Sequence, residues 1–93
     1  MKKWKLIKII IDYQVISFEK LFCDCKCIES IFFKQFYRNN INNMSIMFFG
    51  CSSLKELNFN NCNTINVTNM AGMFWECYSL EVLNLDNFLI LIM

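Results

Sequence analysis

Apolar residues along this chain follow two spacings, and the pair of spacings recurs with a period of 26 residues. In residues 67–80 the apolar positions stand three and four residues apart, which is typical of one face of a helix. In residues 80–88 the spacing changes, and Leu83 and Leu85 alternate with Asn84, as in a short strand with one buried face. The pattern therefore predicts a unit made of a short helix followed by a short strand.

The unit occurs in more than one copy. Residues 44–59 read MSIMFFGCSSLKELNF and residues 70–85 read MAGMFWECYSLEVLNL, so similar residues stand 26 positions apart. A more divergent copy precedes them, and a fixed period of this size indicates stacked repeats. We expect an N-terminal arm of non-repeat sequence (1–14), a repeat array (15–88, divided into 15–40, 41–66 and an incomplete 67–88) and an apolar tail (89–93).

Stacking of the units predicts one continuous core. Cys25, Cys51 and Cys77 share one position of the repeat, which favours a column of reduced, buried thiols over a disulfide between neighbouring units in an oxidising compartment. Thr68 is the expected N-cap of the helix in the third copy. Ile16 stands at the equivalent position of the first copy, where it cannot cap a helix. The expected core residues are Phe22, Cys25, Met47, Phe48, Cys51, Leu54, Leu57, Met73, Phe74, Cys77, Leu80, Leu83 and Leu85.

Parallel strands that stack in register leave their alternate residues in rows on the concave face of the array. Such faces bind partners in repeat proteins, although a solvated polar face is the alternative interpretation. Phe32 is a better candidate anchor than the Asn residues of its row if it is exposed, and the alternative is that the divergent first copy turns it inward. The expected partner-binding rows are Ser30, Glu56 and Val82; Phe32, Asn58 and Asn84; and Lys34, Asn60 and Asp86.

Two segments follow a known consensus. Leu54-x-x-Leu57-x-Phe59 and Leu80-x-x-Leu83-x-Leu85 match the leucine-rich repeat, and NVTNMAGMFWECYSLEVLNLDNF resembles the BspA-like class of bacterial and protist surface proteins. This resemblance spans about residues 15–88. It implies an α/β solenoid of about three helix–strand units with a short parallel sheet on the concave face. It also implies a non-enzymatic interaction module of the adhesion type, at the cell surface or outside the cell, with an unknown protein partner.

The repeat pattern stops after Phe88, where the chain continues as LILIM. We therefore expect a fragment of a longer array, and the alternative is a truncated or frame-shifted product without a partner of its own. A short array also has open ends, through which self-association can occur. The basic start, MKKWKLIKIII, resembles a secretory signal but lacks a cleavage site, so the sequence leaves localisation open.

Composition excludes several functions. The net charge is only +1, so no basic field exists to attract nucleic acid, and no apolar run is long enough to cross a bilayer. The chain has no His and two Gly, which removes the usual base and phosphate loop of an enzyme and indicates no cofactor.

Cys23, Cys25 and Cys27 could hold a soft metal, but without His or a C-x-x-C pair we expect no metal site. Glycosylation sequons begin at Asn43 and Asn66, where turn chemistry is the simpler interpretation.

Overall fold

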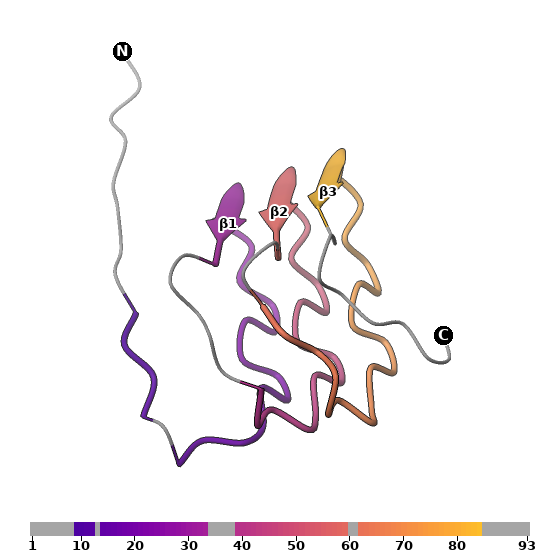
Figure 1. Ribbon diagram of the computed structural model, residues 1–93. Helices are drawn as coiled ribbons and strands as arrows, with labels where there is room; N and C mark the ends of the chain where they lie inside the picture. Colours follow the sequence, from indigo (N-terminus) through magenta and orange to yellow (C-terminus); the bar gives the residue numbers. More distant parts are fainter. Residues whose placement is uncertain (1–8, 13, 34–38, 60–61, 85–93) are drawn as a thin grey trace.

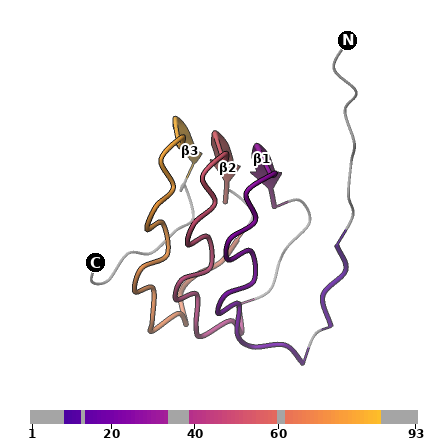
Figure 2. The same ribbon diagram turned by 180° about the vertical axis from the view of Figure 1, so that it is seen from behind.

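The computed structural model describes residues 9–12, 14–33, 39–59 and 62–84. Three short strands in these segments form a parallel sheet in the order β1 (Ser30–Phe32), β2 (Glu56–Asn58) and β3 (Val82–Asn84). Ile31 pairs with Leu57 and Leu57 with Leu83, so neighbouring strands are aligned at the 26-residue spacing. Each strand ends one unit: the first unit is residues 17–33, the second 43–59 and the third 69–84. The units lie side by side when seen from the front and from behind (Figures 1 and 2).

The part of each unit that precedes its strand is a run of tight turns, and the described residues contain no helix. In the second unit, the backbone N–H groups of Met47, Phe49 and Cys51 donate to carbonyls three residues earlier. An α-helix would instead use carbonyls four residues earlier. The predicted α/β leucine-rich-repeat solenoid of helix–strand units is therefore wrong, and the fold is a small, mainly β structure.

The alternate N–H groups of these turns bond to the neighbouring unit. Met44, Ile46, Phe48 and Gly50 donate to the carbonyls of the residues 25 positions later, at 2.8, 2.8, 3.0 and 2.9 Å. The first unit bonds to the second in the same way, for example from Phe18 N–H to the Asn43 carbonyl at 2.8 Å. Because each amide has a single hydrogen to donate, these bonds between units replace the bonds that a helix would form within itself.

Two backbone positions in every unit have a left-handed conformation, which also prevents a helix. They are four residues apart, and each recurs at the repeat spacing. At the first position φ is 61° for Lys20, 46° for Ile46 and 64° for Gly72, and at the second it is 59° for Asp24, 74° for Gly50 and 62° for Glu76. These turns are closed by hydrogen bonds between residues three apart, and they place apolar side chains on one side of the backbone much as a helix does. The apolar spacing alone was therefore ambiguous.

The core lies between the sheet and the turns, and the second unit fills its middle. Met47, Phe48, Cys51, Leu54 and Leu57 are completely buried. The ring of Phe48 stacks between those of Phe22 and Phe74, with centroid distances of 5.6 and 5.9 Å and interplanar angles of 6° and 1°. Equivalent side chains thus pack on one another from unit to unit, as the backbone does.

A polar residue shapes the first turn of every unit. The side-chain oxygens of Ser17, Asn43 and Asn69 each accept a hydrogen bond from the N–H two residues later, at 3.2, 2.9 and 3.1 Å. These three residues are also bridged to one another across the units. The predicted helix cap at Thr68 is thus wrong, because no helix begins there and the Thr68 hydroxyl donates to the Asn42 carbonyl of the preceding unit at 3.2 Å.

Candidate interaction surface

The sheet has one face toward the core and one toward solvent, because successive side chains of a strand point to opposite faces. Ile31, Leu57 and Leu83 form the row between the two outward rows. One outward row consists of Ser30, Glu56 and Val82, and the other of Phe32, Asn58 and Asn84. We call these six residues the sheet surface.

Apolar and polar groups are mixed on the sheet surface. The side chain of Phe32 is 51% exposed and that of Val82 is 44% exposed, while Glu56, Asn58 and Asn84 are half-buried. An exposed phenylalanine beside amide and carboxylate groups can insert into an apolar pocket while its neighbours form hydrogen bonds. Of the residues predicted for this surface, Lys34, Asn60 and Asp86 lie outside the described residues, as does the predicted core residue Leu85.

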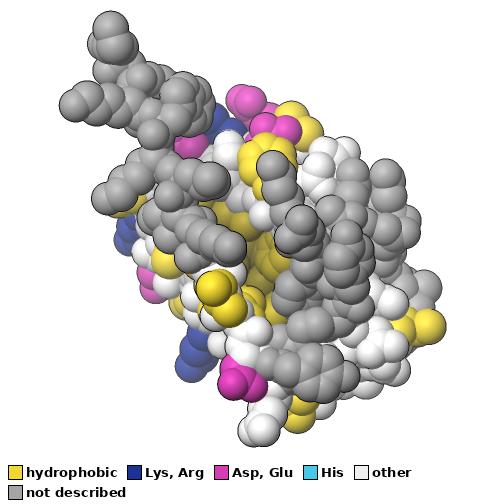
Figure 3. All heavy atoms as spheres, turned by 60° about the vertical axis from the view of Figure 1, so that its left-hand side comes forward, with side chains coloured by type: hydrophobic (Ala, Val, Ile, Leu, Met, Phe, Trp, Pro, Cys, Tyr) yellow, Lys and Arg dark blue, Asp and Glu magenta, His cyan; other side chains and the backbone are white. Residues whose placement is uncertain are grey.

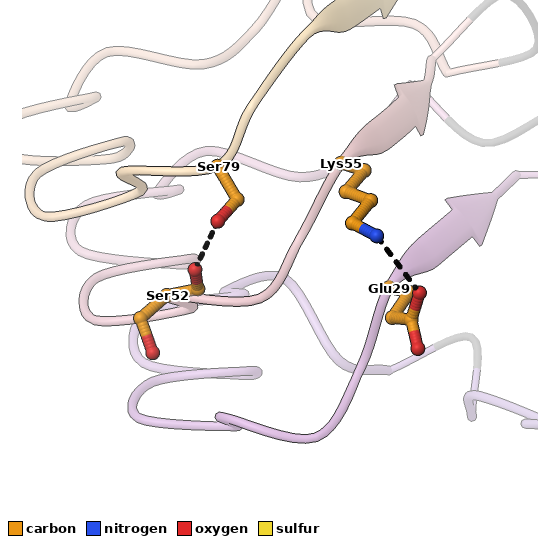
Figure 4. Close-up of polar contacts among 4 residues, drawn as sticks. All are labelled: Glu29, Ser52, Lys55 and Ser79. Carbon is orange, nitrogen blue, oxygen red and sulfur yellow. Dashed lines mark hydrogen bonds and ion pairs between the residues drawn. The ribbon is translucent and has the colours of Figure 1, made fainter.

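A charged row borders the sheet surface, and the sequence interpretation missed it. Lys55 forms an ion pair with Glu29 at 3.4 Å between Nζ and Oε1 (Figure 4). The N–H of Glu81 donates to the Lys55 carbonyl. Glu29, Lys55 and Glu81 stand 26 residues apart, so the repeat spacing that aligned the other rows could have identified this one. Together with Glu56, the row gives this side of the sheet three carboxylates and one ammonium group.

The cysteine of the repeat is buried in the second unit and half-buried in the first and third, and two of these thiols bond neighbouring units together. Cys51 Sγ donates to the Phe22 carbonyl at 3.0 Å, and Cys77 Sγ donates to the Phe48 carbonyl at 3.1 Å. All the described cysteines have free thiols. Ser79 adds a parallel contact, because its hydroxyl donates to the Ser52 carbonyl at 2.7 Å (Figure 4). These thiols therefore serve as small apolar side chains that also connect neighbouring units.

Replacing Cys51 with alanine is expected to lower the free energy of unfolding by about 1–2 kcal/mol, because it leaves a small cavity and removes one of the two hydrogen bonds to the Phe22 carbonyl. Cys23 is half-buried, and its only thiol contact found in the described part of the chain is with Asp24 at 3.9 Å. Cys23→Ala should therefore change the free energy of unfolding by less than about 0.5 kcal/mol. Urea denaturation of both variants measures this, and a larger loss in Cys23→Ala would contradict the assigned repeat positions.

Burial raises the pKa of the Cys51 thiol to about 11 and that of Cys62 to about 12. Desolvation is the main cause for both, and the neighbouring Cys77 adds to the effect on Cys51. A thiol with a raised pKa is protonated near neutral pH and is a poor nucleophile. The buried cysteines are therefore unsuited to covalent catalysis.

Stability should consequently fall in alkaline solution. A thiol whose pKa is higher in the folded than in the unfolded chain stabilises the fold fully below its unfolded value, near pH 9, and this contribution is lost as the pH rises toward 11–12. Unfolding between pH 9 and 11 should release up to about two more protons per molecule from the wild type than from Cys51→Ala/Cys62→Ala. Urea melts across this range measure the slope, and equal slopes would show that neither thiol has a raised pKa.

Other sequence features have structural partners. Asn43 closes a turn through its side-chain oxygen, and the Asn66 amide donates to the Asn39 carbonyl at 2.6 Å, so both sequon asparagines are engaged. No cluster of three metal-ligating side chains occurs among the described residues. In the same part of the chain, no helix is long and apolar enough to cross a membrane. The basic arm, residues 1–8, lies outside the described residues.

A family model described as "Mycoplasma protein of unknown function, DUF285" matches residues 3–90. No curated protein and no solved structure matches the chain. The predicted membership of the BspA-like leucine-rich-repeat family is therefore wrong. That prediction rested on the leucine spacing. In the structure this spacing comes from one inward-facing residue in each short strand and from apolar residues in the turns before the strand, and no helix takes part.

Proposed function

We propose that this chain, which belongs to the DUF285 family, is a non-enzymatic module that binds another protein through its sheet surface. The observation that carries the proposal is the exposed Phe32 side chain, held on a three-stranded sheet beside polar groups. Backbone bonds between units fix the strands, so the surface is ordered before a partner arrives. Preorganisation of this kind reduces the entropy lost on binding.

The charges around Phe32 favour a particular kind of partner. Glu29, Glu56 and Glu81 lie near or on the sheet surface with Lys55 as the one ammonium group among them. A protein segment that offers an apolar pocket or side chain for Phe32 and Lys or Arg for the carboxylates would complement this surface. Absence of His from the sequence and protonation of the buried thiols support binding over catalysis.

Selection from a displayed library of random peptides tests the proposal, with the folded full chain as the bait. We expect enriched peptides to combine an aromatic or aliphatic residue with Lys or Arg. Phe32→Ala and Glu56→Lys should each weaken binding of these peptides at least about tenfold, the effect of losing a central contact. Trp75→Ala is the matched control, since Trp75 is 67% exposed and lies in the turns outside the sheet.

The binding results for the sheet variants and the Trp75 control distinguish the sheet surface from other sites. Loss of binding in the two sheet variants and its retention in Trp75→Ala would support the assignment of the sheet surface. Peptides that bind Phe32→Ala as tightly as the wild type would overturn it, and so would a selection that enriches no peptide.

A further inference from the structure

The first and third units expose apolar side chains at positions that are buried in the second unit. Leu21 is 39% exposed, whereas its equivalent Met47 is completely buried. Leu83 is also 39% exposed, whereas its equivalent Leu57 is completely buried. Apolar side chains are visible near the middle of the side of the molecule that carries the first unit (Figure 3). Among the described residues, the repeated contact between units is thus left unfinished at both ends.

The backbone groups at the two ends are complementary. In the third unit, the N–H groups of Met70, Gly72, Phe74 and Glu76 have no acceptor within the described part of the chain, although their equivalents in the second unit donate to the next unit. In the first unit, the carbonyls of Ser17, Glu19, Leu21 and Cys23 likewise have no donor within the described segments, although their equivalents accept such bonds. Four donors on one end therefore match four acceptors on the other.

Side chains at the two ends also match. Phe22 and Phe74 end the stack of rings that has Phe48 at its centre, and both are half-buried. Cys51 and Cys77 each donate to a carbonyl of the preceding unit, and Cys25 is the equivalent thiol of the first unit. A first unit placed after a third unit would stack Phe22 on Phe74 and bring the Cys25 thiol to the Phe74 carbonyl.

We propose that copies of this chain associate head to tail, with the third unit of one copy against the first unit of the next. The contact continues the interface that already joins the second and third units, so the bound surface is a second copy of the same chain. The two surfaces in the contact differ, so the contact is heterologous and each added copy presents the same free end for the next one, until the assembly closes into a ring. This inference goes beyond the proposed function, since it uses the ends of the molecule and leaves the sheet surface free.

One row of side chains opposes this contact and provides its test. Glu29, Lys55 and Glu81 are neighbours in that order, with Glu29 and Lys55 paired at 3.4 Å. Head-to-tail association would place Glu81 of one copy beside Glu29 of the next, and these two carboxylates repel each other. Reversing either charge would replace this repulsion with an ion pair like that of Glu29 and Lys55.

Sedimentation velocity over a range of concentrations of the full chain provides the measurement. We expect the average mass of the wild type to rise with concentration. Glu81→Lys and Glu29→Lys should each tighten association roughly three- to tenfold at low salt. The double variant Glu29→Lys/Glu81→Lys restores a like-charge pair, so it should return to the wild-type affinity. Glu56→Lys is the matched control, because it changes the net charge equally but lies on the middle strand.

The charge-reversal series distinguishes this head-to-tail contact from nonspecific self-association. Tightening in both single variants, reversed in the double variant and absent in Glu56→Lys, would establish the contact between Glu81 and Glu29 of neighbouring copies. Monomers at all concentrations in every variant would overturn the proposal, and so would a double variant that associates as tightly as the single ones. Because peptide binding uses the sheet surface, its failure would leave these outcomes unchanged.

Discussion

Phe48→Ala is expected to lower the free energy of unfolding by about 3–5 kcal/mol, which is a large part of the stability of a small domain. Phe48 is completely buried and stacks on a phenylalanine from each neighbouring unit. Its ring also meets that of Phe59 edge-on, with centroids 5.6 Å apart. Removal of the ring therefore takes contacts from all three units at once, and urea denaturation followed by circular dichroism measures the loss.

Two phenylalanines of the same chain serve as controls for this result. Phe74→Ala should cost less than Phe48→Ala, because Phe74 is half-buried and its stacked partner in the described structure lies on one side only. Phe32→Ala should change stability by less than about 0.5 kcal/mol, since its ring is 51% exposed. Equal losses in Phe48→Ala and Phe32→Ala would mean that the packing between units is not as the structure describes it.

Gly50→Ala is expected to destabilise the fold by about 1–3 kcal/mol, through backbone strain and crowding together. Gly50 has a φ of 74°, a conformation that residues with a Cβ rarely adopt. A Cβ at this position would also overlap the Asp24 carboxylate of the first unit. Thermal melts of the variant and the wild type measure the change.

The two causes can be separated in a second background. Asp24→Ala removes the carboxylate, so Gly50→Ala should cost less in that background, and the remainder reports the backbone strain alone. Gly72→Ala is the parallel case, with a φ of 64° and a Cβ that would lie 3.0 Å from Ile46 Cγ2. A Gly50→Ala variant as stable as the wild type would show that residue 50 does not have a left-handed conformation in the folded chain.

Part of the structure follows directly from the spacing of residues. Glu56 pairs with Ser30 and Val82, and Asn58 pairs with Phe32 and Asn84, each 26 residues from its partners. The alternation of Leu83 and Leu85 with Asn84 indicates a strand, because no other regular structure buries every second side chain. Strand positions and their alignment were therefore accessible from the repeat alone.

The predicted helices failed for a reason that local sequence could not reveal. Residues 44, 47, 48 and 51 satisfy the spacing of a helical face, and Ile46 is a β-branched residue that normally avoids its observed φ of 46°. The deciding factor is the neighbouring unit, which accepts hydrogen bonds from Met44, Ile46, Phe48 and Gly50. Gly50 and Gly72 were the available signals of left-handed positions, but each stands in only one of the units.

By itself, the sequence determined the 26-residue period, the three strand positions and the residues that share each row, because these depend on which side chains can be buried together. Only the tertiary structure decided how the backbone between the strands is arranged, because its N–H groups had a choice between carbonyls four residues back and carbonyls of the next unit. It also decided which equivalent residues are buried. Met47 and Leu57 are completely covered, whereas Leu21 and Leu83 are not, since burial depends on a neighbour on each side.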